Sequence, residues 1–211
     1  MALINTPTSI GFAEIELTAR NAVAISQSPF TFSTQTHVYP GQMWQANISI
    51  PPVQRDLAEP WVAFLLALNG PANTFLLGDP LGATPRGSID GDTVLANNAG
   101  ATDANTNGVS TIYVDGLTTS QTGLLVAGDY IQLGTASSAT LHKVLSSVDS
   151  DGSGEATIDI WPHLRRDLVD DEAVTYINAK GLFRLSGPQQ NWSINSSNVY
   201  GISFGAMEVI G

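Results

Sequence analysis

The chain has 211 residues, of which 43% are hydrophobic and only 13% are charged, so it can bury one large core or two small ones, and wholesale disorder is excluded. Its 19 acidic and 8 basic residues give a formal net charge of −11, and an ordinary nucleic-acid-binding surface is excluded because such a charge repels phosphates. The absence of cysteine excludes disulfides and every thiolate-based catalytic or metal site.

The first expected elements are β-strands. Residues 30–38 are rich in aromatic and β-branched side chains, and Pro40-Gly41 predicts a turn after them. From Trp44 to Ile50, apolar residues alternate with polar ones, which is the period-2 pattern of a half-buried strand. Pro51-Pro52 is expected to end this strand.

One α-helix is expected over residues 56–69. Asp56 and Glu59 have the spacing of a capping box at its start, and Asn69-Gly70-Pro71 is typical of a helix end. One apolar stripe follows the helical spacing and predicts a face that packs in the core. That stripe consists of Leu57, Trp61, Phe64, Leu65 and Leu68.

Short strands are expected in the rest of the chain. Gly- and Asp-containing turns separate runs of apolar and β-branched residues at close spacing, which favours a small barrel or sandwich for the middle of the chain. The expected strands cover residues 74–77, 111–114, 129–133, 141–148, 156–161, 173–177, 181–185, 191–194 and 200–210.

Charge is unevenly distributed along the chain and predicts two domains. Residues 82–180 hold 13 of the 19 acidic residues, while both ends of the chain carry few charges. We therefore expect an outer domain formed by residues 1–83 and 181–211, and an inserted acidic domain formed by residues 84–180. Linker signals fill residues 83–108. The predicted fold class is mainly β, with a single packed helix in the outer domain and a small β-barrel as the insert.

Motifs that could carry chemistry are weak. Residues 201–205 spell G-x-S-x-G, but a nucleophile elbow needs a following helix and a later histidine, and neither is expected here. Residues 149–155 resemble the start of a calcium loop, yet Ile160 stands where the bidentate glutamate belongs, so a turn is the better interpretation. The three histidines, His37, His142 and His163, lack metal-binding spacing.

Two tryptophans are candidates for contact with a glycan or a partner protein. Trp161 precedes a proline at a strand end, and Trp192 lies in a polar stretch, whereas Trp44 and Trp61 are expected in the core. Burial or a subunit interface is the favoured interpretation of both candidates. No catalytic, metal or cofactor site is predicted, and we expect no enzymatic activity.

The start of the chain lacks the basic region and long apolar stretch of a secretory signal. Its longest apolar run covers residues 61–68, far below the ~20 residues that span a bilayer. A soluble protein made without an export signal is therefore expected.

Several short blocks resemble tail proteins of long-tailed bacteriophages, and the distal tail proteins of siphophages most of all. The similarity covers most of the chain, although no block is diagnostic alone. The blocks are residues 41–46, 50–52, 59–65, 74–80, 128–134, 160–165 and 181–185.

The resemblance implies a tail-tube-like β-sandwich with one helix, and an inserted barrel of the OB-like or SH3-like kind. It also implies a hexameric ring at the tail tip that joins the tail tube protein to the hub and tip proteins. DNA would pass through the ring without specific binding, and the protein would be found in the virion, after assembly in the host cytoplasm. We expect the acidic insert to face outward from such a ring, with no insertion into a membrane.

Other functions remain open at this point. The chain could be another tube, adaptor or tail-completion ring protein, a carbohydrate-binding module that attaches the virion to its host, or a glycan hydrolase. Ring closure through paired strand edges favours the ring hypothesis physically, because it removes exposed edges.

Overall fold

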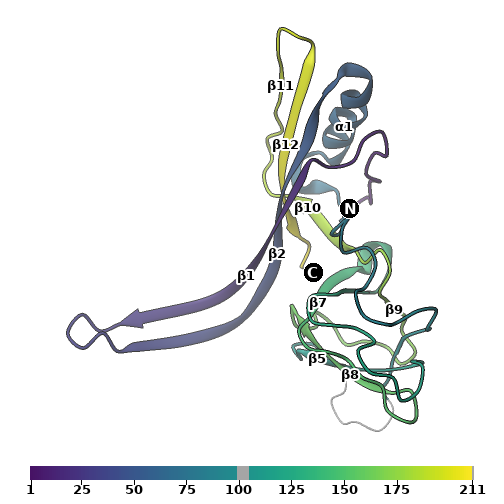
Figure 1. Ribbon diagram of the computed structural model, residues 1–211. Helices are drawn as coiled ribbons and strands as arrows, with labels where there is room; N and C mark the ends of the chain where they lie inside the picture. Colours follow the sequence, from purple (N-terminus) through teal and green to yellow (C-terminus); the bar gives the residue numbers. More distant parts are fainter. Residues whose placement is uncertain (99–104, 211) are drawn as a thin grey trace.

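The computed structural model describes residues 1–98 and 105–210, and residues 99–104, within the predicted linker 83–108, lie outside the described part. The fold is mainly β with one α-helix, as predicted, and two six-stranded sheets carry it (Figure 1). The elements in chain order are β1 (Glu14–Gln27), β2 (Thr34–Gln54), α1 (Arg55–Leu68), the 3-10 turn η1 (Gly70–Ala72), β3 (Phe75–Leu77), β4 (Leu95–Ala96), β5 (Thr111–Asp115), β6 (Tyr130–Leu133), the 3-10 turn η2 (Ala136–Ser138), β7 (Thr140–Val144), β8 (Ala156–Trp161), β9 (Val174–Thr175), β10 (Gly181–Leu185), β11 (Trp192–Ile194) and β12 (Val199–Glu208).

The first sheet, here called the terminal sheet, takes its strands from both ends of the chain. Its order is β1-β2-β12-β10-β3, and β11 pairs with β12 beside this path. The paired strands are antiparallel throughout. The predicted domain boundaries stay a prediction, but every strand of this sheet lies before residue 83 or after residue 180.

The second sheet closes almost completely and is here called the barrel. Its order is β4-β5-β8-β7-β6-β9. The two end strands meet through the bridge between Leu95 and Ala173. The backbone N–H of Val174 also donates to the carbonyl of Val94 at 2.9 Å. Pairing of these end strands leaves little free edge, which is the usual benefit of closing a sheet.

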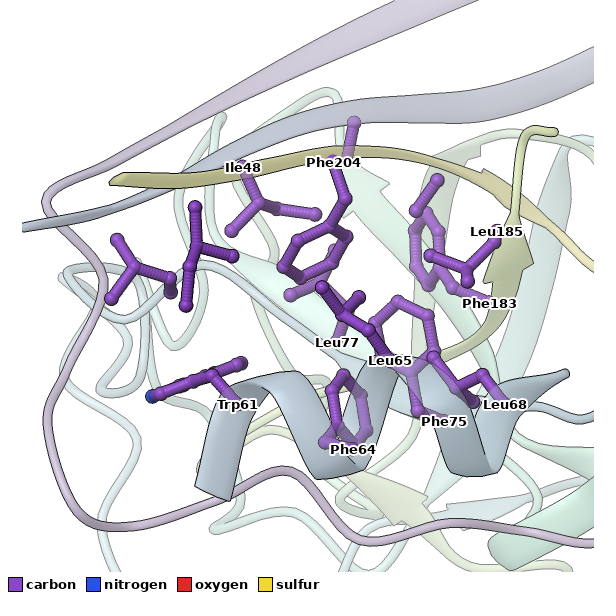
Figure 2. Close-up of a cluster of buried hydrophobic side chains, with 14 of the residues drawn as sticks. Ile48, Trp61, Phe64, Leu65, Leu68, Phe75, Leu77, Phe183, Leu185 and Phe204 are labelled. Atoms are coloured by element: carbon purple, nitrogen blue, oxygen red, sulfur yellow. The ribbon is translucent and has the colours of Figure 1, made fainter. Parts of the chain in front are cut away.

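Helix α1 packs on one face of the terminal sheet. Figure 2 shows Trp61, Phe64 and Leu65 directed at the side chains of the sheet. Phe64 meets Phe75 edge-on with ring centroids 5.4 Å apart, a favourable arrangement for aromatic pairs. The buried side chains of the helix are Ala58, Trp61, Val62, Phe64, Leu65 and Leu68.

The predicted helix is present, but two details of its start are wrong. The helix begins at Arg55 rather than Asp56, and its N-cap residue Gln54 makes no side-chain capping bond. Glu59 instead pairs with Arg55 at 3.1 Å. Leu57, expected in the core, is 43% exposed because the buried face is centred on Ala58 and the residues three and four positions further on.

Strand β2 differs most from the sequence-based expectation. It continues through Pro40-Gly41, where a turn was expected, and through Pro51-Pro52, where an end was expected. Pro51-Pro52 falls where the register between β2 and β12 shifts, so the missing proline N–H groups interrupt no regular ladder there. Residues 30–33, expected in a strand, form the turn between β1 and β2.

The packing of α1 yields a stability prediction. Leu65 is fully buried in the terminal core, and the Leu65→Ala change should lower the free energy of unfolding by roughly 2–5 kcal/mol, because it leaves a cavity. Denaturant unfolding followed by circular dichroism measures this. Leu66→Ala is the control, since Leu66 is 61% exposed and its truncation should change stability by less than about 0.5 kcal/mol. Equal losses for the two variants would contradict the packing described here.

Candidate functional site: an exposed hairpin arm and its root

The hairpin of β1 and β2 extends far beyond the sheet that it belongs to (Figure 1). β12 pairs with β2 only from Gln45 to Gln54. Toward the hairpin turn, β2 has no partner but β1 among the residues described. Residues 22–41 therefore form a two-stranded ribbon, here called the arm. Such a ribbon is marginally stable alone in water, and other packing usually stabilises it.

The arm exposes almost its whole surface. Every residue from 22 to 41 except Ser28 is exposed. Val23 and Val38 are cross-strand partners, and Ile25 lies on the same face two residues from Val23. At the hairpin turn, Phe30 is 91% and Phe32 72% exposed. Apolar side chains gathered on a projecting element indicate an interaction surface.

The arm also lacks charge. No aspartate, glutamate, lysine or arginine occurs in residues 21–54. Natural proteins commonly protect free strand edges with charged side chains, above all lysine, and the arm has no such protection. Its edges are therefore open to pairing with another chain.

Sequence reasoning missed the arm. Strand β1 was not predicted, although residues 14–20 alternate polar and apolar side chains and Ile15 and Leu17 are half-buried. From residue 21 onward both faces of this strand are solvent-exposed and the alternation is lost. The available signal was the uncharged run from residue 21 to 54 in a chain with 27 formally charged side chains. Within that run, residues 22–41 lack the apolar–polar alternation of residues 44–50, and an uncharged strand without that alternation favours an interface strand.

A β-bulge marks the root of the arm. Asn21 pairs with Gln42, and the next pair is Val23 with Val38, so the register shifts between them. One residue of β1 thus lies opposite three residues of β2, among them Pro40 and Gly41. Bulges bend a strand and increase its twist, and Figure 1 shows the arm turning away from the terminal sheet.

The barrel contacts the root through the segment after β8. The indole Nε1 of Trp161 donates to Asn21 Oδ1 at 2.9 Å. The backbone N–H of His163 donates to Gln42 Oε1 at 2.8 Å, and His163 Nδ1 lies 2.9 Å from the same oxygen. Residues 161–163 thus hold the last pair before the bulge on both strands.

Tryptophans fill the apolar part of this contact. Trp44 of β2 and Trp161 of β8 meet edge-on with ring centroids 4.5 Å apart. Trp44 Nε1 donates to the carbonyl of Leu141 in β7 at 3.0 Å. Tyr130 and Leu141 of the barrel belong to the same hydrophobic cluster as Trp44. The two sheets therefore share packed side chains next to the arm root.

A buried ion pair reinforces the contact. Arg165 Nη2 lies 2.8 Å from Glu208 Oε2, and Glu208 also accepts the backbone N–H of Trp44 at 3.0 Å. Burial raises the pKa of the Glu208 carboxyl, and Arg165 opposes this effect. Glu208 Oε1 and Arg165 Nε are buried without a hydrogen-bond partner within the described residues, so the pair stabilises the fold less than a fully bonded one.

His142 supports the same segment from inside the barrel. Its Nδ1 lies 2.7 Å from the carbonyl oxygen of Pro162, and its Nε2 lies 2.8 Å from Thr140 Oγ1. The ring is fully buried, and burial lowers the pKa of His142 to about 4. His142 is therefore neutral at physiological pH.

The structure separates the two tryptophans predicted as contact residues. Trp161 belongs to the contact between the two sheets next to the arm root, here called the joint, and is half-buried. Trp192 lies on β11 of the terminal sheet and is 36% exposed. The two side chains belong to different sheets and do not form one stacking platform.

The weak motifs lie in ordinary structural positions. The G-x-S-x-G segment 201–205 is part of strand β12. In the candidate calcium loop, Asp151 Oδ1 accepts the backbone N–H groups of Ser153 and Glu155 at 2.8 and 2.9 Å, as in a turn. Among the described residues, no cluster of three or more histidine or acidic side chains could hold a metal ion.

No family model matches the chain, and no curated protein sequence matches it significantly. Within residues 1–98 and 105–210, no helix has the length and apolar character needed to cross a membrane.

The burial of His142 predicts a pH dependence of stability. Because its folded pKa lies below the unfolded value, stability is fully present above about pH 6.5 and is lost as the pH falls toward 4. We expect the free energy of unfolding to drop by about 2 kcal/mol between pH 7 and pH 5 from this residue. Urea unfolding at both pH values, in wild type and His142→Gln, measures the difference.

The Gln variant is the matched control because it keeps a polar side chain but does not titrate. His163 contributes a smaller change of the same sign, since burial lowers its pKa too. An equal drop in wild type and variant would contradict the assignment to His142.

Proposed function

We propose that this chain is a non-enzymatic structural component of a bacteriophage tail tip, where identical copies form a ring between the tail tube and the hub or tip proteins. The sequence resemblance to siphophage distal tail proteins suggests the location and a six-fold copy number. The observation that carries the proposal is the exposed, uncharged arm, which suits a protein whose stable form is an assembly.

Electrostatics favours a second copy of the chain as the partner of the arm. Each chain carries a net charge of −11, and copies that meet through their acidic barrels would repel one another. The arm carries no formal charge, so identical chains can share it without that penalty. Its free edges and apolar faces then become buried between neighbours, as closed rings require.

The other face of the terminal sheet suits a channel wall. Because Trp44, Ala46 and Ile48 are buried on the face that packs against α1 and the barrel, the alternate residues Gln45 and Asn47 lie on the opposite face. Ser49, Ser203 and Gly205 continue this polar, small-residue surface. The register places the acidic Glu16 as well as the basic Arg20 on this face, so the face offers passing DNA no continuous basic surface to bind. The barrel, proposed as OB-like or SH3-like, would face outward.

A carbohydrate-binding module remains the alternative from another class, as does a different ring position in the tail. The sugar hypothesis relied on Trp161 and Trp192. Trp161 is engaged with Trp44 and Asn21, which leaves Trp192 as the accessible one of the two. No observation on the structure favours this alternative over the ring.

A charge placed on the arm should prevent assembly. Ile25→Lys puts a cation on the apolar face of the ribbon, and its burial in a subunit contact is unfavourable without a partner. We expect at least a ten-fold higher concentration for half-assembly, with the melting temperature of the monomer unchanged. Light scattering after size-exclusion chromatography, together with negative-stain imaging, distinguishes monomers from assembled particles.

Val169→Lys is the matched control, because Val169 in the barrel is 70% exposed, close to the 68% of Ile25. Its assembly should equal that of wild type. A wild-type chain that stays monomeric at high concentration, or an Ile25→Lys variant that forms closed particles normally, would overturn the role of the arm. Monomers that bind glycans through Trp192 would support the alternative.

A further inference from the structure

The arm leaves the terminal sheet at the point where residues 161–163 form hydrogen bonds to its root. The bulge separates the pair Asn21 and Gln42 from the first pair of the arm. Both of these side chains accept hydrogen bonds from residues 161–163 of the barrel, at 2.8 to 2.9 Å. The last residue pair on the sheet side of the bend is therefore held on both strands by one short segment, the end of β8 and the two residues after it.

The bend itself has few restraints of its own. Ala22 on β1 and residues 39–41 on β2 are exposed, and the strands there are out of register. A cavity of about 240 Å³ borders this point, lined in part by Arg20, Gly41 and Ile210. A two-stranded ribbon with a bulge at its base can swing unless something holds the base.

Residues 161–163 are themselves fixed by packing and hydrogen bonds. Trp161 packs edge-on against Trp44, and Pro162 is buried, with its carbonyl oxygen 2.7 Å from His142 Nδ1. Arg165 follows closely and reaches Glu208 at the end of β12. The donors on Trp161 and His163 thus project from a rigid base.

We propose that Asn21 and Gln42 are positioning residues through which the barrel fixes the angle of the arm, and thereby the closure of the ring. The proposal rests on the function proposed above. In a ring, each arm must meet its neighbour at one angle, because a small error repeated around the ring gives an open or larger assembly. The barrel then has a part in assembly, although the paired edges of the ring would come from the arm.

Distances between two spin labels test these contacts of Asn21 and Gln42 with residues 161–163, here called the clamp. The chain has no cysteine, so Thr31→Cys in the hairpin turn and Leu145→Cys in the barrel give two unique labelling sites on exposed residues. Labelled chains are diluted into unlabelled ones so that only distances within one chain are read. In the Asn21→Ala/Gln42→Ala double variant we expect the distance distribution to broaden at least two-fold, and closed particles in negative-stain images to fall at least five-fold.

The matched control is Ser26→Ala/Gln35→Ala, a cross-strand pair within the arm and beyond the bulge. It should leave both the distance distribution and the particles unchanged. Thermal melting reports whether the clamp variant folds. If it does not, Gln42→Met keeps the length of the side chain, removes the acceptor of both His163 contacts, and should broaden the distribution in the same direction.

An unchanged distance distribution in the folded clamp variant would overturn the proposal, whether or not rings form. A broadened distribution with wild-type ring closure would overturn the link to assembly. A wild-type chain that never assembles overturns the proposed function, and broadening would then still support the clamp, so the two failures can be told apart.

Discussion

The central constraint on this protein is that the two strands of the arm cannot pair all of their own backbone N–H and carbonyl groups. Each outer edge of the arm presents N–H and carbonyl groups to water, and neither face of the ribbon rests on a core. α1 covers one face of the terminal sheet, and the barrel nearly closes on itself. The barrel thus leaves little free edge, whereas both edges of the arm are free within the described residues; β3 and β11 are the other edge strands of the terminal sheet.

The contact between the two sheets contains buried polar and charged groups, which the arm lacks. Packed tryptophans, a buried ion pair and a buried neutral histidine lie in the joint. These groups are sensitive to small displacements, because a buried charge or polar atom without its partner is unfavourable. They therefore specify one geometry between the sheets, whereas the arm, with no buried polar groups of its own, specifies almost none.

Much of this fold could be predicted from the sequence where one face of an element is buried. The alternation around Trp44 to Ile50 and the stripe along α1 both reflect such a face, and the helix and this strand segment lie where they were expected. Where both faces of a strand are exposed to solvent, as in residues 21–27, the periodic signal is absent. The alternation of residues 14–20 was a usable signal that the prediction did not take up. Pro40-Gly41 has the same local chemistry in a turn as in a bulge, and only the pairing with β1 decides between them. The contact between the sheets at Trp161 depends on residues 121 to 140 positions apart in the sequence, which no local pattern encodes.

The contrast between the buried second half of β2 and the exposed arm has an evolutionary consequence. Its second half contributes Trp44, Ala46, Ile48 and Ile50 to the core, while residues 22–41 contribute nothing to either hydrophobic cluster. Substitutions in the arm are thus nearly invisible to folding, and selection there acts through whatever the arm touches. Among related proteins, this stretch should diverge quickly and in step with its contact surface, while the strand that continues from it stays almost fixed.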